Sequence, residues 1–145
     1  MSAELLSTIL PMMLRGLQVT LQVEVIGILL GFVLGAVSGY ALQSRSRIAR
    51  GIASVYIWII RGTPIVVQAL YVYFVVPAII SLATGDRFVL DSTVAGIIVI
   101  TLNAGAFISA IVKGALEGVD EGQREAGAAL GLSHRQILFR IVIPP

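Results

Sequence analysis

The stretch LQVTLQVEVIGILLGFVLGAVSGYAL, residues 17–42, decides the class of this protein, because Glu24 is its single charged side chain. A helix rises about 1.5 Å per residue, so these residues extend about 39 Å, and the hydrocarbon core of a bilayer is about 30 Å thick. Residues 17–42 are therefore predicted to form a helix that crosses a membrane.

The composition of the whole chain supports a membrane protein. Hydrophobic residues make up 57% of the chain and charged residues 12%, whereas soluble domains carry about 25% charged residues. The chain has no cysteine, which excludes disulfides and thiolate metal sites. A net charge of +2 is too small to indicate a nucleic-acid partner. The high apolar content instead predicts that lipid surrounds the chain.

Two further apolar runs predict two more spans, over residues 52–83 and 94–112. A short polar break, Arg61 to Pro64, interrupts the first of these runs. Threonine before proline is typical of a helix N-cap followed by a proline at the first helical position. A helix start or a kink is therefore predicted near Pro64, with Thr63 as its N-cap. Residues 1–16 are too broken by Pro11 to span, and they are predicted to form a short, separate interfacial helix.

The basic residues are distributed unevenly about these three spans. Arg15 and Arg87 lie on one side, and the other eight of the ten lie on the opposite side. These eight are Arg45, Arg47, Arg50, Arg61, Lys113, Arg124, Arg135 and Arg140. Because loops rich in lysine and arginine stay in the cytoplasm, the N-terminus is predicted to lie outside and residues 114–145 in the cytoplasm.

Small and polar residues within the spans indicate how the helices pack. Glycines recur every four residues at positions 27, 31, 35 and 39, so one face of the first helix admits close approach by another helix. Packing inside one subunit is the ordinary explanation of such a face, and a subunit interface or a moving contact is the alternative. Glu24, Gln68 and Asn103 are candidates for a pathway wall or for interhelical packing. Glu24 also lies near the outer end, where it can reach the interface.

The segment after the third span is polar but patterned. Residues 121–130 consist mainly of helix formers, and Gly131 follows where a left-handed turn would end the helix. Ser133 and Gln136 have the spacing of a capping box that starts a second helix. A compact helical hairpin is therefore predicted within residues 114–145.

This hairpin resembles the EAA loop of ABC importer permeases, in which EAA is followed by three residues, G, nine residues, I, any residue, L and P. The matching residues are Glu125, Ala126, Gly127, Gly131, Ile141, Ile143 and Pro144. Residues 61–68 (RGTPIVVQ), residues 103–107 (NAGAF), and Gly122 with Gln123 resemble the branch of the family that moves polar amino acids. The resemblance covers about residues 14–145. Departures from the family pattern are Gly127 for the third small residue and Ile143 for leucine. Family members also often carry glutamate and arginine where this chain has Ala110 and Lys113.

The resemblance implies an all-α permease with five spans, of which this chain holds three spans and the cytoplasmic hairpin. It implies the membrane subunit of an importer of polar amino acids, working with a second permease subunit in a homodimer or heterodimer, ABC ATPase subunits and an extracytoplasmic substrate-binding protein. Glu125, Ala126, Gly127, Gly131 and Pro144 would couple the permease to the ATPase. The chain contains no GxxxxGK[ST] loop, so a partner would bind the ATP, and no cofactor is expected here.

Two other classes of function are weaker. An intramembrane enzyme would need reactive groups at one depth, but the only histidine, His134, lies in the hairpin and Asp86 and Asp91 lie in the outer loop. A small channel or scaffold assembled through the glycine face is the better alternative, although it would not need the EAA spacing.

Overall fold

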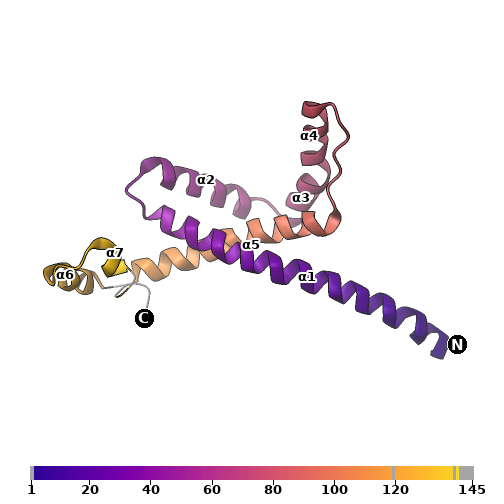
Figure 1. The fold of residues 1–145 in the computed structure, drawn as a ribbon, viewed down its shortest axis with the longest axis horizontal. Helices are drawn as coiled ribbons and strands as arrows, with labels where there is room; N and C mark the ends of the chain where they lie inside the picture. Colours follow the sequence, from indigo (N-terminus) through magenta and orange to yellow (C-terminus); the bar gives the residue numbers. More distant parts are fainter. Residues whose placement is uncertain (1, 119, 139, 141–145) are drawn as a thin grey trace.

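The computed structural model describes residues 2–118, 120–138 and 140, which form helices and loops without a strand (Figure 1). Three stretches of helix are long and apolar enough to cross a membrane, namely Ser7–Leu42, Ile65–Thr84 and Ser92–Glu117. The predicted class, an all-α polytopic membrane protein with three candidate spans, is therefore confirmed. The third of these, α5 (Ser92–Glu117), extends beyond the predicted residues 94–112 at both ends.

The first helix is longer than the sequence pattern indicates. It is α1 (Ser2–Leu42), a single helix of 41 residues that passes through Pro11. The prediction of a separate helix over residues 1–16 is therefore wrong. A proline removes one backbone hydrogen bond, and in this apolar setting that loss does not end the helix. At about 1.5 Å per residue α1 is about 62 Å long, and Figure 1 shows its N-terminal half projecting beyond the other helices.

The glycine face of α1 packs against α5. A Cβ built on Gly27, Gly31, Gly35 or Gly39 would lie 2.6–2.7 Å from side-chain atoms of Ile100, Ala104, Ile108 and Val112 respectively. The pairing partner advances by four residues at each step, so α1 and α5 run side by side in the same direction. The glycines thus let the two helices approach more closely than any side chain would permit. Packing inside one chain, one of the two predicted roles, accounts for this face.

The run predicted as one span over residues 52–83 is broken into separate helices. Its first part belongs to α2 (Arg47–Gly62), and a new helical stretch starts after the break with α3 (Ile65–Leu70). The break leaves Ile65–Thr84 as the candidate span within this run. The reason is Pro64, which donates no backbone hydrogen bond and has extended geometry with φ −58° and ψ 137°.

The predicted helix start near Pro64 is confirmed, but the predicted cap is wrong. Pro64 itself occupies the N-cap position, and its carbonyl accepts from the backbone N–H groups of Val67 and Gln68. The hydroxyl of Thr63 donates backwards to the carbonyl of Ile59 at 2.8 Å. Thr63 therefore closes the end of α2 instead of opening α3.

The second candidate span continues as η1, a π-helical turn (Tyr71–Val75), and α4 (Val76–Thr84). Pro77 lies in the first turn of α4, so its missing N–H falls next to the wider π-helical turn. In Figure 1, α3 and α4 turn away from the α1 and α5 pair, and a loop returns the chain to the start of α5. Asp91 caps α5 by accepting from Thr93 at 2.9 Å and Val94 at 3.2 Å.

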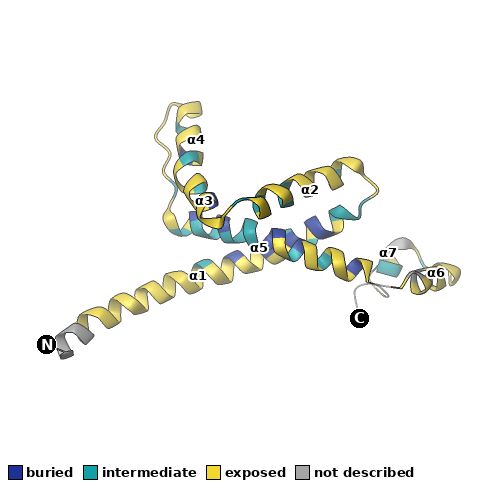
Figure 2. Ribbon diagram, turned by 180° about the vertical axis from the view of Figure 1, so that it is seen from behind, coloured by how far each residue is buried: buried dark blue, intermediate teal, exposed yellow. Residues whose placement is uncertain are grey.

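Two short helices, α6 (Glu121–Ala129) and α7 (His134–Ile137), complete the described chain. They lie beyond the C-terminal end of α5, at the opposite end of the molecule from the N-terminus (Figure 1). Figure 2 shows that most buried residues lie along the contact between α1 and α5, with single buried positions in other helices such as Gln68 and Pro77. Many large apolar side chains, such as Trp58 (78% exposed) and Leu82 (88% exposed), lie on the surface, as expected of a protein solvated by lipid.

Candidate functional site

The predicted hairpin between α6 and α7 is present, and its corner is held by backbone hydrogen bonds. Gly131 has a left-handed φ of 76°. Its N–H donates to the carbonyl of Ala128 at 2.9 Å, and the N–H of Leu132 donates to that of Gly127 at 3.1 Å. These two bonds form a Schellman motif, which satisfies carbonyls that the end of a helix leaves unpaired. The structure thus confirms the glycine corner, with α6 ending at Ala129 instead of Leu130.

Both helices of the hairpin have side-chain caps at their starts. The carboxylate of Asp120 accepts from the N–H of Gly122 at 2.7 Å, which caps α6. At the start of α7, Gln136 Oε1 accepts from the N–H of Ser133 at 2.8 Å, and Ser133 Oγ accepts from the N–H of Gln136 at 3.4 Å. This reciprocal pair is the predicted capping box. Short-range hydrogen bonds therefore define the hairpin.

The side chains of the predicted coupling residues lie mainly on the surface of the hairpin. Glu125 and Ala126 are exposed and Gly127 is buried, while Gly131 is exposed at the corner. Leu130, beside that corner, is 81% exposed. Small residues next to an exposed leucine and a carboxylate form a slim surface that another protein can approach closely. Pro144, the last predicted coupling residue, lies outside the described residues.

Gln68 connects the two helices that meet at Pro64. The carbonyl of Ile60 would ordinarily accept from the N–H four residues later, but that residue is Pro64 and has no N–H. Gln68 Nε2 supplies the missing donor at 2.7 Å from the Ile60 carbonyl, and it also donates to the Thr63 carbonyl at 2.8 Å. Gln68 is buried, with 8% of its surface exposed. It therefore acts as a clamp across the break, a structural role, and no contact in the structure assigns it to the pathway.

Replacing Gln68 with leucine is expected to destabilise the protein by about 1–3 kcal/mol, because two part-buried carbonyls lose their donor. Gln68→Glu is expected to be at least as harmful, since a carboxylate has no N–H to donate. The measurement is the free energy of unfolding of the full-length protein in mixed micelles. Gln22→Leu, at an exposed position of α1, is the matched control and should change this free energy little. Equal stabilities of the Gln68 and Gln22 variants would contradict the clamp.

The two sequence motifs RGTP and NAGAF contact each other, which the sequence alone does not reveal. The guanidinium carbon of Arg61 lies 5.3 Å from the ring centre of Phe107, within the range of a cation–π interaction. Nearby, Tyr56 Oη donates to the carbonyl of Leu102 at 2.7 Å. A Cβ on Gly105 would lie 2.7 Å from that hydroxyl and 3.1 Å from the side chain of Leu34. Gly105 thus allows α1, α2 and α5 to meet at one point.

The other two candidate pathway residues remain without an assigned role. Glu24 is exposed on α1, and Asn103 is half-buried on α5. Neither side chain makes a hydrogen bond or ion pair with another residue in the described part of the chain. Glu24, Gln68 and Asn103 lie on three different helices, and the structure shows no hydrogen bond that joins them. Their membership of one pathway stays a prediction.

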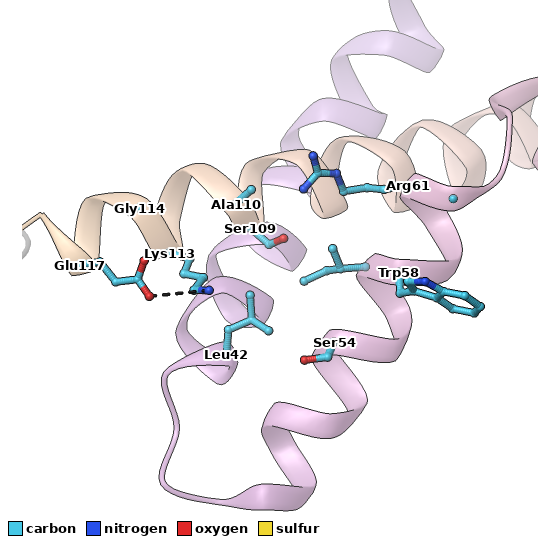
Figure 3. Close-up of a pocket in the computed structure, with 11 residues that line it drawn as sticks. Leu42, Ser54, Trp58, Arg61, Ser109, Ala110, Lys113, Gly114 and Glu117 are labelled. Atoms are coloured by element: carbon cyan, nitrogen blue, oxygen red, sulfur yellow. Dashed lines mark ion pairs between the residues drawn. The ribbon is translucent and has the colours of Figure 1, made fainter.

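A groove lies between α2 and the C-terminal half of α5, and we name it the inner groove (Figure 3). Its volume is about 690 Å³. The residues that line it come from the end of α1, from α2 and from α5, and they are Leu42, Ser54, Ile57, Trp58, Arg61, Gly62, Ser109, Ala110, Lys113, Gly114 and Glu117. Lys113 Nζ lies 3.7 Å from Glu117 Oε1. The lysine is thus paired with a carboxylate one turn later along α5.

These features define a polytopic helical membrane protein with a capped hairpin beyond the end of its third candidate span. The chain belongs to the family of binding-protein-dependent transport system inner membrane components, whose family model matches residues 27–145. It is therefore a multi-pass membrane protein, and the predicted resemblance to ABC importer permeases is confirmed.

Individual relatives agree with this assignment. The chain is 38% identical to the glutamine transport system permease protein GlnP of Escherichia coli K12, over 93% of this chain and 59% of the relative. It is 31% identical to the L-cystine transport system permease protein TcyB of Bacillus subtilis, over 92% of this chain and 54% of the relative. A crystal structure of an amino acid ABC transporter with histidines superposes with a TM-score of 0.79 and 27% identity, over 96% of this chain and 62% of that one. The chain thus spans somewhat more than half the length of these proteins.

Proposed function

We propose that this chain forms the membrane-spanning part of an ATP-driven importer of polar amino acids and transmits the movement of a separate ATPase through the hairpin of α6 and α7. The observation that carries the proposal is the hairpin itself. It has the EAA spacing of the predicted family, a left-handed corner at Gly131 with φ 76°, and caps at both helix starts. Such a corner fixes the angle between two short helices. A hairpin that transmits movement from one protein to another needs a fixed angle of this kind.

Glu125, Ala126 and Gly127 have the chemistry to dock into a cleft of a partner. Glu125 can pair with a basic group there, and the small residues 126 and 127 let α6 approach the walls of the cleft. The chain itself contributes no phosphate-binding loop, so ATP hydrolysis belongs to the ATPase. A second permease subunit and an extracytoplasmic substrate-binding protein complete the proposed importer. The names of the relatives, which refer to transport of glutamine and L-cystine, support polar amino acids as the substrate class.

Capture of the ATPase tests this proposal directly. Full-length protein with an affinity tag, produced together with its partner proteins, should retain an ATP-hydrolysing subunit on purification in detergent. Leu130→Glu, which places a charge on the exposed leucine beside the corner, should weaken that retention. The outer-loop variant Val89→Glu, at a residue that is 68% exposed, is the matched control. An ATPase that never co-purifies with the native protein would overturn the proposal.

The distribution of basic residues supports an orientation with the N-terminus outside and the hairpin in the cytoplasm. In a cysteine-free background, Ser46→Cys should be protected from a membrane-impermeant thiol reagent added to intact cells, and Thr84→Cys should react. Both positions are exposed, so burial inside the protein does not account for a difference between them. Permeabilised cells serve as the control, because both cysteines should then react. Labelling of the Ser46 variant alone in intact cells would reverse the orientation.

The alternative of a channel or scaffold assembled through the glycine face loses its main support. That face packs against α5 of the same chain, where added side chains would meet Ile100, Ala104, Ile108 and Val112 within 2.7 Å. A face filled by its own chain is not available to a second copy. The importer is therefore the function that the geometry supports best.

A further inference from the structure

The inner groove carries an unbalanced positive charge. Lys113 and Glu117 form an ion pair at 3.7 Å and offset each other. Arg61 lies over the ring of Phe107 and has no carboxylate partner within the described residues. Figure 3 shows the guanidinium above Ala110, at the edge of the groove and apart from the lysine and glutamate. The three charged groups that line the groove therefore sum to +1, which complements an anion with a single negative charge.

The position of the inner groove fits a phospholipid better than a soluble anion. Phe107 lies ten residues before the end of α5, so the groove occupies about the last 15 Å of this candidate span. In the orientation proposed above, this stretch extends from the boundary between headgroups and acyl chains on the cytoplasmic side into the acyl chains. Trp58, which is 78% exposed, lies at the rim, and tryptophan is enriched at this boundary. Apolar side chains such as Leu42 and Ile57 line the wall.

We propose that the inner groove binds an anionic phospholipid of the cytoplasmic leaflet, with the phosphodiester at the guanidinium of Arg61 and an acyl chain running from there along α3, toward the middle of the bilayer. Basic pockets between membrane helices on the cytoplasmic side are suited to such headgroups. In that direction the exposed side chains of Val66 at 67% and Leu70 at 52% provide the apolar surface for the chain. This inference rests on the proposed function only for the side of the membrane on which the groove lies.

The test measures lipid binding to the full-length protein in its assembled complex. Delipidated complex is titrated with phosphatidylglycerol, or with phosphatidylcholine as the zwitterionic control, and bound lipid is counted by native mass spectrometry. Adding or removing one positive charge near an anionic lipid changes the binding affinity about fivefold. Arg61→Gln should therefore weaken phosphatidylglycerol binding about fivefold, whereas Arg61→Lys should keep most of it. Arg87→Gln, in the loop before α5, is the matched control and should change nothing.

A gain of affinity gives the sharper test, because misfolding cannot produce it. Glu117→Gln removes the partner of Lys113 and raises the charge of the groove to +2, so phosphatidylglycerol should bind about fivefold more tightly. Glu117 is exposed, and its replacement should not disturb packing. Identical binding in the native, Arg61→Gln and Glu117→Gln proteins would overturn the proposal.

Two further outcomes would assign the groove to a different occupant. If inorganic phosphate displaced phosphatidylglycerol at equal concentration, the site would be one for soluble anions and the lipid assignment would be wrong. If a photoreactive amino acid at position 58 cross-linked to protein instead of lipid, another protein segment would fill the groove. Neither measurement depends on transport, so failure here and failure of the importer proposal are distinguishable.

Discussion

Replacing Gly35 with leucine is expected to separate α1 from α5 and to destabilise the protein by about 3 kcal/mol or more. A Cβ at this position would lie 2.6 Å from the Cβ of Ile108 and 2.9 Å from the carbonyl oxygen of Gly105. The second of these atoms belongs to the backbone of α5, so a change of side-chain rotamer cannot relieve the clash. The helices would have to move apart along a face with three other glycine contacts. The measurements are the free energy of unfolding in mixed micelles and the amount of protein in the membrane.

Gly16 supplies the control for this prediction. It lies on the same helix as Gly35, but a Cβ there would meet nothing within 4 Å. Gly16→Leu should therefore leave stability and membrane abundance near those of the native protein, while adding the same apolar side chain to α1. If the two variants were equally stable, close packing through the glycine face would not hold α1 and α5 together.

Replacing Gly131 with valine is expected to lower ATP-dependent uptake about tenfold or more without lowering insertion into the membrane. The left-handed conformation costs a residue with a Cβ about 1–2 kcal/mol, and it is especially unfavourable for a β-branched side chain. A Cβ at Gly131 would meet nothing within 4 Å, so the expected effect comes from the backbone alone. The hairpin is short and lies outside the three candidate spans, so its corner should yield while the spans remain intact. Uptake of labelled amino acid into vesicles loaded with ATP is the measurement.

Asparagine at the same position separates backbone strain from the loss of glycine itself. Asparagine tolerates the left-handed region far better than valine, so Gly131→Asn should retain most of the uptake. Both variants should be present in the membrane at the native amount. Normal uptake by the Gly131→Val protein would mean that the corner does not carry the coupling, and loss of uptake in both variants would implicate contacts at the glycine instead of its conformation.

Local patterns in the sequence predicted the hairpin well. The turn at Gly131 and the pairing of Ser133 with Gln136 involve residues within a few positions of each other, so nearby residue types are sufficient to predict them. The break at Pro64 was predicted for the same reason. The predicted role of Thr63 as the N-cap of the following helix was wrong, because its hydroxyl donates to the carbonyl of Ile59 at 2.8 Å. A threonine at a helix break can bond to the helix before it or to the helix after it, and its position in the sequence does not decide between them.

The role of Gln68 could in part have been predicted from spacing. Pro64 follows Ile60 at the interval of one helical hydrogen bond, which leaves the Ile60 carbonyl without a donor. A glutamine four residues after the proline can supply it. Burial decides whether it does so, and burial of Gln68 depends on how α2, α3 and α5 meet. That meeting is set by contacts between residues far apart in the sequence.

The sequence by itself determined the membrane location, the three apolar candidate spans and the hairpin, because length, hydropathy and local capping are properties of contiguous residues. Only the tertiary structure decided that the glycine face of α1 receives α5, that Arg61 lies on Phe107, and that the inner groove keeps a net positive charge. Each of these depends on the register between helices. A repeat of small residues predicts a face for close packing, but it does not predict which helix packs against that face. The continuity of α1 through Pro11 was decided in the same way, since one missing hydrogen bond is a small loss in a long apolar helix.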